Sequence, residues 1–108
     1  MPSLELPQGT LDLLVLRVLS AGEMHGWGIA QRLSILSDSA LQLQEGTIYP
    51  ALYRMEAKGW VASDWAISDN NRRAKYYRLT KIGRKQLATQ HQTWDRLTTV
   101  VADVLRRA

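Results

Sequence analysis

The 108-residue chain has no cysteine, which excludes disulfide frameworks, thiolate metal sites and cysteine nucleophiles. It has no long apolar run either. The longest, at residues 11–19, is interrupted by Asp12 and Arg17 and is far shorter than the roughly 20 residues of a membrane-spanning helix. Residues 1–9 contain acidic Glu5 and no basic residue, so we do not expect a secretory signal. Together these absences predict a soluble protein of the reducing cytoplasm.

The sequence also lacks the usual patterns of enzymes. We find no phosphate-binding glycine loop, no metal-ligand spacing and no recognisable pair of catalytic carboxylates. The two histidines, His25 and His91, are not expected to meet, and His25 at the start of a helix is expected to be structural. We therefore expect no enzymatic activity, no metal and no cofactor.

The composition that is present, 45% hydrophobic and 22% charged residues, is typical of a globular domain. The length allows one core and leaves no room for a separate catalytic or sensor domain. Half of the fourteen basic residues lie between positions 72 and 85, where there is no acid. Such a cluster is typical of a surface that binds phosphate polyanions, although a solvated basic face is the alternative interpretation.

Hydrophobic periodicity and capping residues predict the order of elements. Thr10 and Thr80 are candidate N-caps of the first and last helices. The expected helices and strands are helices at 10–20, 25–36, 47–58 and 80–105, a short edge strand at 41–44, and β-strands at 60–67 and 74–79. This order predicts a mainly α fold with a small β-hairpin, that is, a winged helix-turn-helix at residues 1–80 followed by a dimerisation helix at 81–108.

The helix expected at 47–58 is the candidate recognition helix. Pro50 is expected in its first turn, where an amide hydrogen has no acceptor within the helix. The positions expected to face DNA are Thr47, Pro50, Ala51 and Arg54, with Tyr49 and Tyr53 along the borders. Arg54 is the best candidate reader, because a guanidinium can donate two hydrogen bonds to guanine or to a phosphate. For the tyrosines the alternative is packing against the wing, which is the favoured interpretation for Tyr53.

The loop between the two strands of the hairpin is polar and basic. In such folds the wing reaches the adjacent minor groove or its phosphates, a contact for which Arg72, Arg73 and Lys75 are candidates. Asn70 and Asn71 are candidates for the same contact. For these two asparagines we favour a role in the turn itself, because asparagine tolerates left-handed backbone conformations.

The last helix carries apolar residues at heptad-like spacing. These seam residues are Leu87, Trp94, Leu97, Val101 and Val104. Because one small core cannot cover them all, we expect a homodimer. A two-fold dimer would hold two recognition helices about 34–36 Å apart and select an inverted-repeat operator in double-stranded DNA. His91 is a candidate for pH sensitivity near this interface.

Several segments resemble the PadR-like family of transcriptional regulators over nearly the whole chain. They are QGTLDLL at 8–14, HGWGI at 25–29, EGTIYPAL at 45–52, NNRRAKYYRLT at 70–80 and Gly83 with Arg84. The resemblance implies a dimeric repressor that leaves its operator when a small molecule binds or another signal arrives. The single helix after the wing resembles the compact branch of the family.

The resemblance also implies a candidate effector site at Trp94. In a multidrug-sensing member of the compact branch, a tryptophan at the matching place stacks planar ligands between the two subunits. Packing in the dimer seam is the favoured alternative for Trp94. Trp27 stands where the family more often has tyrosine, which puts in doubt a phosphate contact from a hydroxyl there. From the residues alone, a winged-helix protein-interaction module that does not read DNA is the alternative function.

Overall fold

Four helices and a small antiparallel sheet form the chain, for which a computed structural model describes residues 4–7 and 9–108. The elements, in chain order, are α1 (Thr10–Leu19), β1 (Met24–His25), α2 (Gly26–Leu36), α3 (Glu45–Ala57), β2 (Val61–Ile67), β3 (Arg73–Leu79) and α4 (Lys81–Arg107). The predicted class, mainly helical with a β-hairpin wing, is confirmed. No described helix is long and apolar enough to span a membrane.

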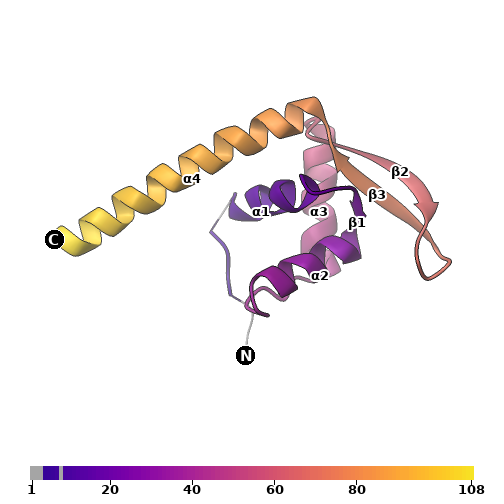
Figure 1. Ribbon diagram of the computed structural model, residues 1–108, viewed down its shortest axis with the longest axis horizontal. Helices are drawn as coiled ribbons and strands as arrows, with labels where there is room; N and C mark the ends of the chain where they lie inside the picture. Colours follow the sequence, from indigo (N-terminus) through magenta and orange to yellow (C-terminus); the bar gives the residue numbers. More distant parts are fainter. Residues whose placement is uncertain (1–3, 8) are drawn as a thin grey trace.

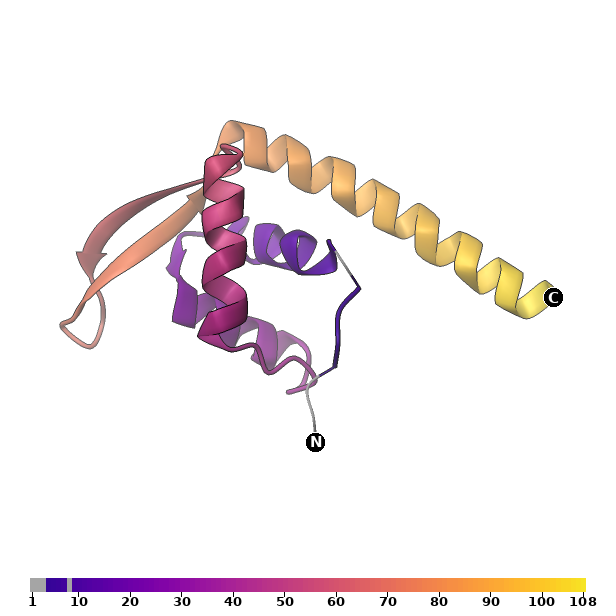
Figure 2. The same ribbon diagram turned by 180° about the vertical axis from the view of Figure 1, so that it is seen from behind.

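The core lies where α1, α2 and α3 meet the inner end of the hairpin. Each helix contributes one apolar face, as its 3.6-residue periodicity predicts. Core side chains that are at most 3% exposed include Val15, Leu16, Leu19, Ile29, Leu33, Ile48, Leu52, Met55, Val61 and Tyr77. The hairpin leaves this core and projects away from it on the side opposite to the free end of α4 (Figures 1 and 2).

The third strand of the sheet is not the one predicted. Residues 41–44 form no strand, and β1 at Met24–His25 pairs instead with Tyr76 and Tyr77 of β3, giving the order β1-β3-β2. Four residues that alternate between apolar and polar are not specific to a strand, because a loop that buries one side chain gives the same pattern. Here the buried side chain of the loop is Leu41. Its backbone N–H donates to the Ser37 hydroxyl at 3.0 Å rather than to a neighbouring strand.

One expected N-cap and one expected helix start were also wrong. Thr10 is the first residue of α1, and the N-cap is Gly9, which has a left-handed φ of 85°. Helix α3 begins at Glu45, two residues earlier than expected, so Pro50 lies inside it rather than in its first turn. Pro50 has no N–H to give the carbonyl of Gly46, but Gly46 is exposed and water can satisfy that carbonyl.

The junction between the hairpin and α4 is tightly built, and here the predicted N-cap is confirmed. The hydroxyl of Thr80 accepts from the Gly83 N–H at 3.0 Å and donates to the Gly59 carbonyl at 2.5 Å. Gly83 is buried against the turn after α3, where a Cβ atom would lie 1.9 Å from the Trp60 carbonyl oxygen. These contacts hold the start of α4 beside the end of α3 (Figure 2).

Candidate nucleic-acid interface

A groove of about 760 Å³ lies between α3, the start of α2 and the wing. Trp27 and Gln31 line it from α2, and Tyr49 and Tyr53 line it from α3. The wing supplies the opposite wall, which is lined by Trp65, Arg72, Arg73, Ala74 and Lys75. The groove therefore combines aromatic rings with cations that can contact phosphates, and the acids Glu45 and Asp69 also line it.

The outer face of α3 differs from the predicted one at Ala51. Ala51 was expected to face DNA, but it is 2% exposed and belongs to the core. Tyr53 is 56% exposed and lies on the outer face; its ring is near the wing, with Lys75 Nζ 5.7 Å from the ring centroid. Thr47 and Pro50 are exposed, as expected. Ala51 was wrongly assigned to the DNA-facing side because the buried apolar face of α3 is wider than expected. It includes position 51 as well as positions 48, 52 and 55.

Tyr49 is held at the border of this face by a close packing contact. Gly26 at the start of α2 leaves space for the ring, because a Cβ there would lie 2.7 Å from Tyr49 Cε1 and Cζ. Burial raises the pKa of the Tyr49 phenol, and the nearby Glu45 and Tyr53 add to the effect. The hydroxyl of Tyr49 therefore remains protonated, and able to donate a hydrogen bond, well above neutral pH.

Arg54, the predicted reader, is engaged inside the protein. Its Nη2 donates to Asp12 Oδ1 at 2.5 Å, and this ion pair joins α3 to α1. Only 10% of the Asp12 side chain is exposed, against 50% of the Arg54 side chain. Asp12 is the one buried acid among the described residues, and the guanidinium of Arg54 compensates the charge of its carboxylate. The sequence offered no signal for this pair, because its members are 42 residues apart.

The cations of the wing are divided between its two faces. On the outer face Arg78 pairs with Asp64 at 2.5 Å. On the inner face Lys75 lies 3.7 Å from Glu56 of α3, a carboxylate that also accepts from the Ser63 hydroxyl. Within the described residues, by contrast, Arg72 and Arg73 enter no ion pair. The tip of the wing therefore presents the cations with least internal compensation.

The loop at the tip is a tight hydrogen-bonded turn. The N–H of Ser68 donates to the Arg72 carbonyl at 2.7 Å, and that of Asn71 donates to the Ser68 carbonyl at 2.9 Å. Asn71 has a left-handed φ of 57°, so its predicted role in the turn is confirmed. Asn70 and Asn71 are both exposed.

Two residues of the groove were not predicted from the sequence. Trp27 was noted only as a departure from the family, but it is 53% exposed and lines the groove. Trp65 was not singled out, and it is 58% exposed on the inner face of the wing. Strand alternation could have revealed it, because Val61, Ser63 and Trp65 share one face of β2.

His25 has a structural role, as expected. Its Nδ1 accepts from the Gly28 N–H at 2.9 Å and so caps the start of α2. Its ring also packs edge-on against Tyr76, with centroids 5.3 Å apart. The described residues include no group of three or more side chains that could hold a metal ion.

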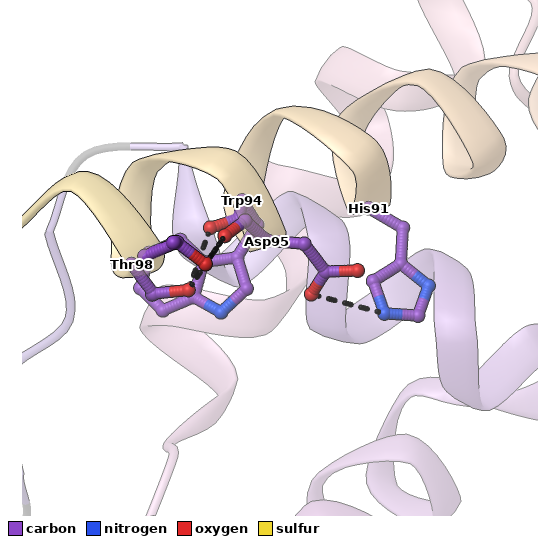
Figure 3. A network of polar contacts seen from close by, with 5 residues as sticks. His91, Trp94, Asp95 and Thr98 are labelled. Carbon is purple, nitrogen blue, oxygen red and sulfur yellow. Dashed lines mark hydrogen bonds and ion pairs between the residues drawn. The ribbon is translucent and has the colours of Figure 1, made fainter. Parts of the chain in front are cut away.

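The predicted seam of α4 is half covered by the body of the molecule. Leu87 and Trp94 are partly buried, whereas Leu97, Val101 and Val104 are 51%, 46% and 58% exposed. A second groove, of about 490 Å³, lies between α4 and α1 and is lined by Asp12, Trp60 and Trp94 among others. Figure 3 shows Trp94 on α4 beside Asp95, whose carboxylate lies 3.8 Å from His91 Nε2.

Comparison with known proteins places the chain in one family. Residues 15–89 match the model of the transcriptional regulator PadR-like family. The transcriptional regulator Rv3488 of Mycobacterium tuberculosis is 30% identical over 93 residues, which cover 86% of this chain and 83% of that protein. A PadR family transcription regulator from Clostridium difficile is 33% identical, with a TM-score of 0.76 over 90% of this chain and 99% of that one.

A transcriptional regulator from Clostridium thermocellum superposes with a TM-score of 0.81 at 27% identity, covering 89% of this chain and 93% of that one. The family match at residues 15–89 includes α2, α3 and both strands of the wing, so it covers every element of the groove. The chain therefore belongs to the PadR-like family of transcriptional regulators.

Proposed function

We propose that this protein is a sequence-specific DNA-binding repressor that acts as a homodimer. The observation that carries the proposal is the groove between α3 and the wing, whose aromatic and cationic walls end in the uncompensated Arg72 and Arg73. Family membership supports DNA binding, because the family consists of transcriptional regulators. The formal net charge of +4 favours association with a polyanion.

In the proposed complex the outer face of α3 enters the major groove and the wing lies along the neighbouring minor groove. Thr47, Tyr49, Pro50 and Tyr53 are the contacts from α3. A tyrosine hydroxyl donates to a phosphate and so positions the helix without reading sequence. Arg54 remains a proposed contact, because half of its side chain is exposed beside this face.

From the wing the proposed contacts are Arg72 and Arg73, with Asn70, Asn71 and Lys75 beside them. Within the described residues, Arg72 and Arg73 need not break an ion pair to meet a phosphate. Lys75 contributes less, because Glu56 already compensates part of its charge. We therefore expect the salt dependence of binding to come mainly from the two arginines.

The proposed dimer forms through the face of α4 that carries Leu97, Val101 and Val104. This face continues the stripe that packs on the body through Leu87 and Trp94, and it remains exposed where α4 extends beyond the body (Figure 1). In a two-fold dimer, the exposed face of α4 in each copy covers that of the other. The same symmetry requires an inverted-repeat operator. A small planar effector is proposed to bind beside Trp94 in the groove between α4 and α1.

Fluorescence anisotropy with duplex DNA from the region upstream of the protein's own gene tests the proposal. We expect salt-dependent binding to one site that competitor DNA does not abolish. The double variant Arg72→Ala with Arg73→Ala should lose affinity and about two units of salt slope per protomer. Arg78→Ala is the control, because it removes a charge from the same wing where Asp64 already compensates it.

Two results would contradict the proposal. One is the absence of binding, and the other is binding that is indifferent to DNA sequence and to salt. A protein that keeps a protein partner when Arg72 and Arg73 are neutralised, while binding no DNA, would instead be the interaction module considered above.

A further inference from the structure

The inner face of the wing carries an exposed apolar surface that the core does not need. Odd-numbered residues of β2 and β3 share this face, because Trp65 is paired with Lys75 and Ile67 with Arg73. Near the core the face is buried at Val61, Tyr77 and Leu79; beyond the core Trp65 is 58% and Ile67 65% exposed. These two side chains leave apolar surface exposed at the outer end of the hairpin, where the core no longer covers it.

Trp65 is coupled to one of the two uncompensated arginines. The guanidinium carbon of Arg73 lies 4.9 Å from the centroid of the Trp65 ring. The two residues are diagonal neighbours across the ladder, which the strand twist brings together. Such a cation and ring pair restricts the guanidinium to one place while its N–H groups keep their hydrogen-bonding capacity.

We propose that Trp65 and Arg73 form one reading unit for the DNA minor groove, and that this unit prefers A·T over G·C pairs beneath the wing. The inference rests on the proposed function. The flat indole fits against the deoxyribose wall, while the guanidinium enters the groove, whose negative potential is strongest where A·T pairs make it narrow. Guanine places an N2 amino donor in that groove, which meets the arginine donors unfavourably.

The dimensions of the wing agree with this placement. A seven-residue strand spans about 23 Å, and the minor groove next to a bound major groove is about half a helical turn, or ~17 Å, away. Trp65 and Arg73 lie in the outer half of β2 and β3, continuous with the groove wall that faces Tyr53. The unit therefore extends the proposed α3 interface rather than forming a separate site.

Base analogues test the inference on the duplex that the wild-type protein binds. Replacing adenine by 2,6-diaminopurine beneath the wing adds an N2 amino group in the minor groove. The major-groove edge of the base pair stays the same as that of an A·T pair. We expect this duplex to bind wild-type protein about tenfold more weakly, a loss of ~1.4 kcal/mol. Inosine·cytosine pairs at the same positions lack the amino group and should bind as A·T pairs do.

The protein variants give the second arm of the test. Trp65→Ala and Arg73→Ala should each bind the natural duplex about tenfold more weakly and discriminate less than threefold against diaminopurine. Trp65→Ala should keep the wild-type salt slope because indole is neutral, whereas Arg73→Ala should lose about one unit per protomer. Trp65→Phe should retain part of the discrimination, and Arg78→Ala, on the outer face of β3, should retain all of it. Circular dichroism confirms that each variant is folded.

The outcomes separate this inference from the proposed function. If wild-type protein binds a specific duplex but tolerates diaminopurine beneath the wing, or if Trp65→Ala discriminates as wild type does, the reading unit is overturned and DNA binding stands. If a change in salt slope accompanies Trp65→Ala, the residue acts through phosphate contacts and the inference is also overturned. If no duplex binds, both fail together.

Discussion

At the scale of single residues, Tyr77 shows how one buried group can oppose the fold. Its side chain is fully buried, and among the described residues its hydroxyl is the one buried side-chain polar atom without a hydrogen-bond partner. Burial raises the pKa of the Tyr77 phenol to about 12, and Tyr53, Glu56 and Tyr49 add to the effect. The ring thus contributes to the core, whereas its hydroxyl carries a cost of desolvation.

We predict that Tyr77→Phe raises the free energy of unfolding by about 1 kcal/mol, because it removes a buried donor that has no acceptor. Urea unfolding at pH 7 measures this change. Tyr76→Phe, at the next position of β3 and on its other face, is the matched control and should change little. A clear destabilisation by Tyr77→Phe would contradict the prediction and would indicate a hydrogen-bond partner for the hydroxyl.

The same residue predicts a loss of stability at high pH. Its pKa is about 12 in the folded chain against 10.0 for a free tyrosine, so between these values the folded chain holds a proton that the unfolded chain has lost. The free energy of unfolding therefore falls as pH rises from 10 to 12. Comparing wild type with Tyr77→Phe over that interval isolates its contribution from other groups, and equal slopes would refute it.

At the scale of elements, the ion pair between Asp12 and Arg54 links the candidate recognition helix to α1. Of the four predicted DNA-contacting cations, Arg54 and Lys75 are paired with acids, whereas Arg72 and Arg73 enter no ion pair within the described residues. Positive charge in the sequence therefore predicted the binding surface as a region better than it predicted the individual contacts. Pairing depends on which acid the fold brings near, and Asp12 lies on another helix.

We predict that Arg54→Gln lowers the free energy of unfolding by about 1–3 kcal/mol, because it leaves the nearly buried Asp12 carboxylate without its charged donor. Asp12→Asn in the same chain should recover part of this loss. Urea unfolding of the two single variants and the double variant gives the coupling free energy.

A control for this cycle is available on the wing. Arg78→Gln breaks a pair whose acid, Asp64, has 73% of its side chain exposed, so it should cost little. A coupling free energy near zero between Asp12 and Arg54 would show that the pair does not hold α3 in place.

At the scale of the whole molecule, α4 decides the shape. Its 27 residues span about 40 Å at 1.5 Å each, and the molecule measures 55 Å along its longest axis. The helix packs on the body near its start, and its last turns extend beyond the body (Figure 1). The second half of the helix also carries most of its exposed large apolar residues, namely Leu97, Val100, Val101, Val104 and Leu105.

We predict that Val101→Glu converts the proposed dimer to a monomer, because it places a charge in the centre of the seam. Sedimentation velocity measures the change, and DNA affinity should fall by about 100-fold or more as bivalent contact is lost. Thr99→Glu is the control, since two positions along a helix point in nearly opposite directions. A wild-type chain that sediments as a monomer at micromolar concentration would contradict the proposal.

Features encoded by near neighbours could be predicted from the sequence. The periodicity of the helices, the Thr80 cap and the polar turn at Asn71 depend on residues within one or two turns of each other. These features were sufficient to predict the winged helix-turn-helix fold and the location of the basic wing. The sequence motifs within the same segments were sufficient to predict the family. The start of α3 at Glu45 and the cap of α1 at Gly9 were predicted less well, because capping alternatives lie only a residue or two apart.

Only the tertiary structure decided the features that depend on distant partners. Two residues, Met24 and His25, become a strand because β3 lies beside them, although it follows them by about 50 positions. Ala51 is buried, and Arg54, Lys75 and Arg78 are paired, for the same reason. The exposure of Trp65 likewise depends on where the core ends under the hairpin. Such outcomes follow from the spatial arrangement of whole elements, which local patterns of sequence do not encode.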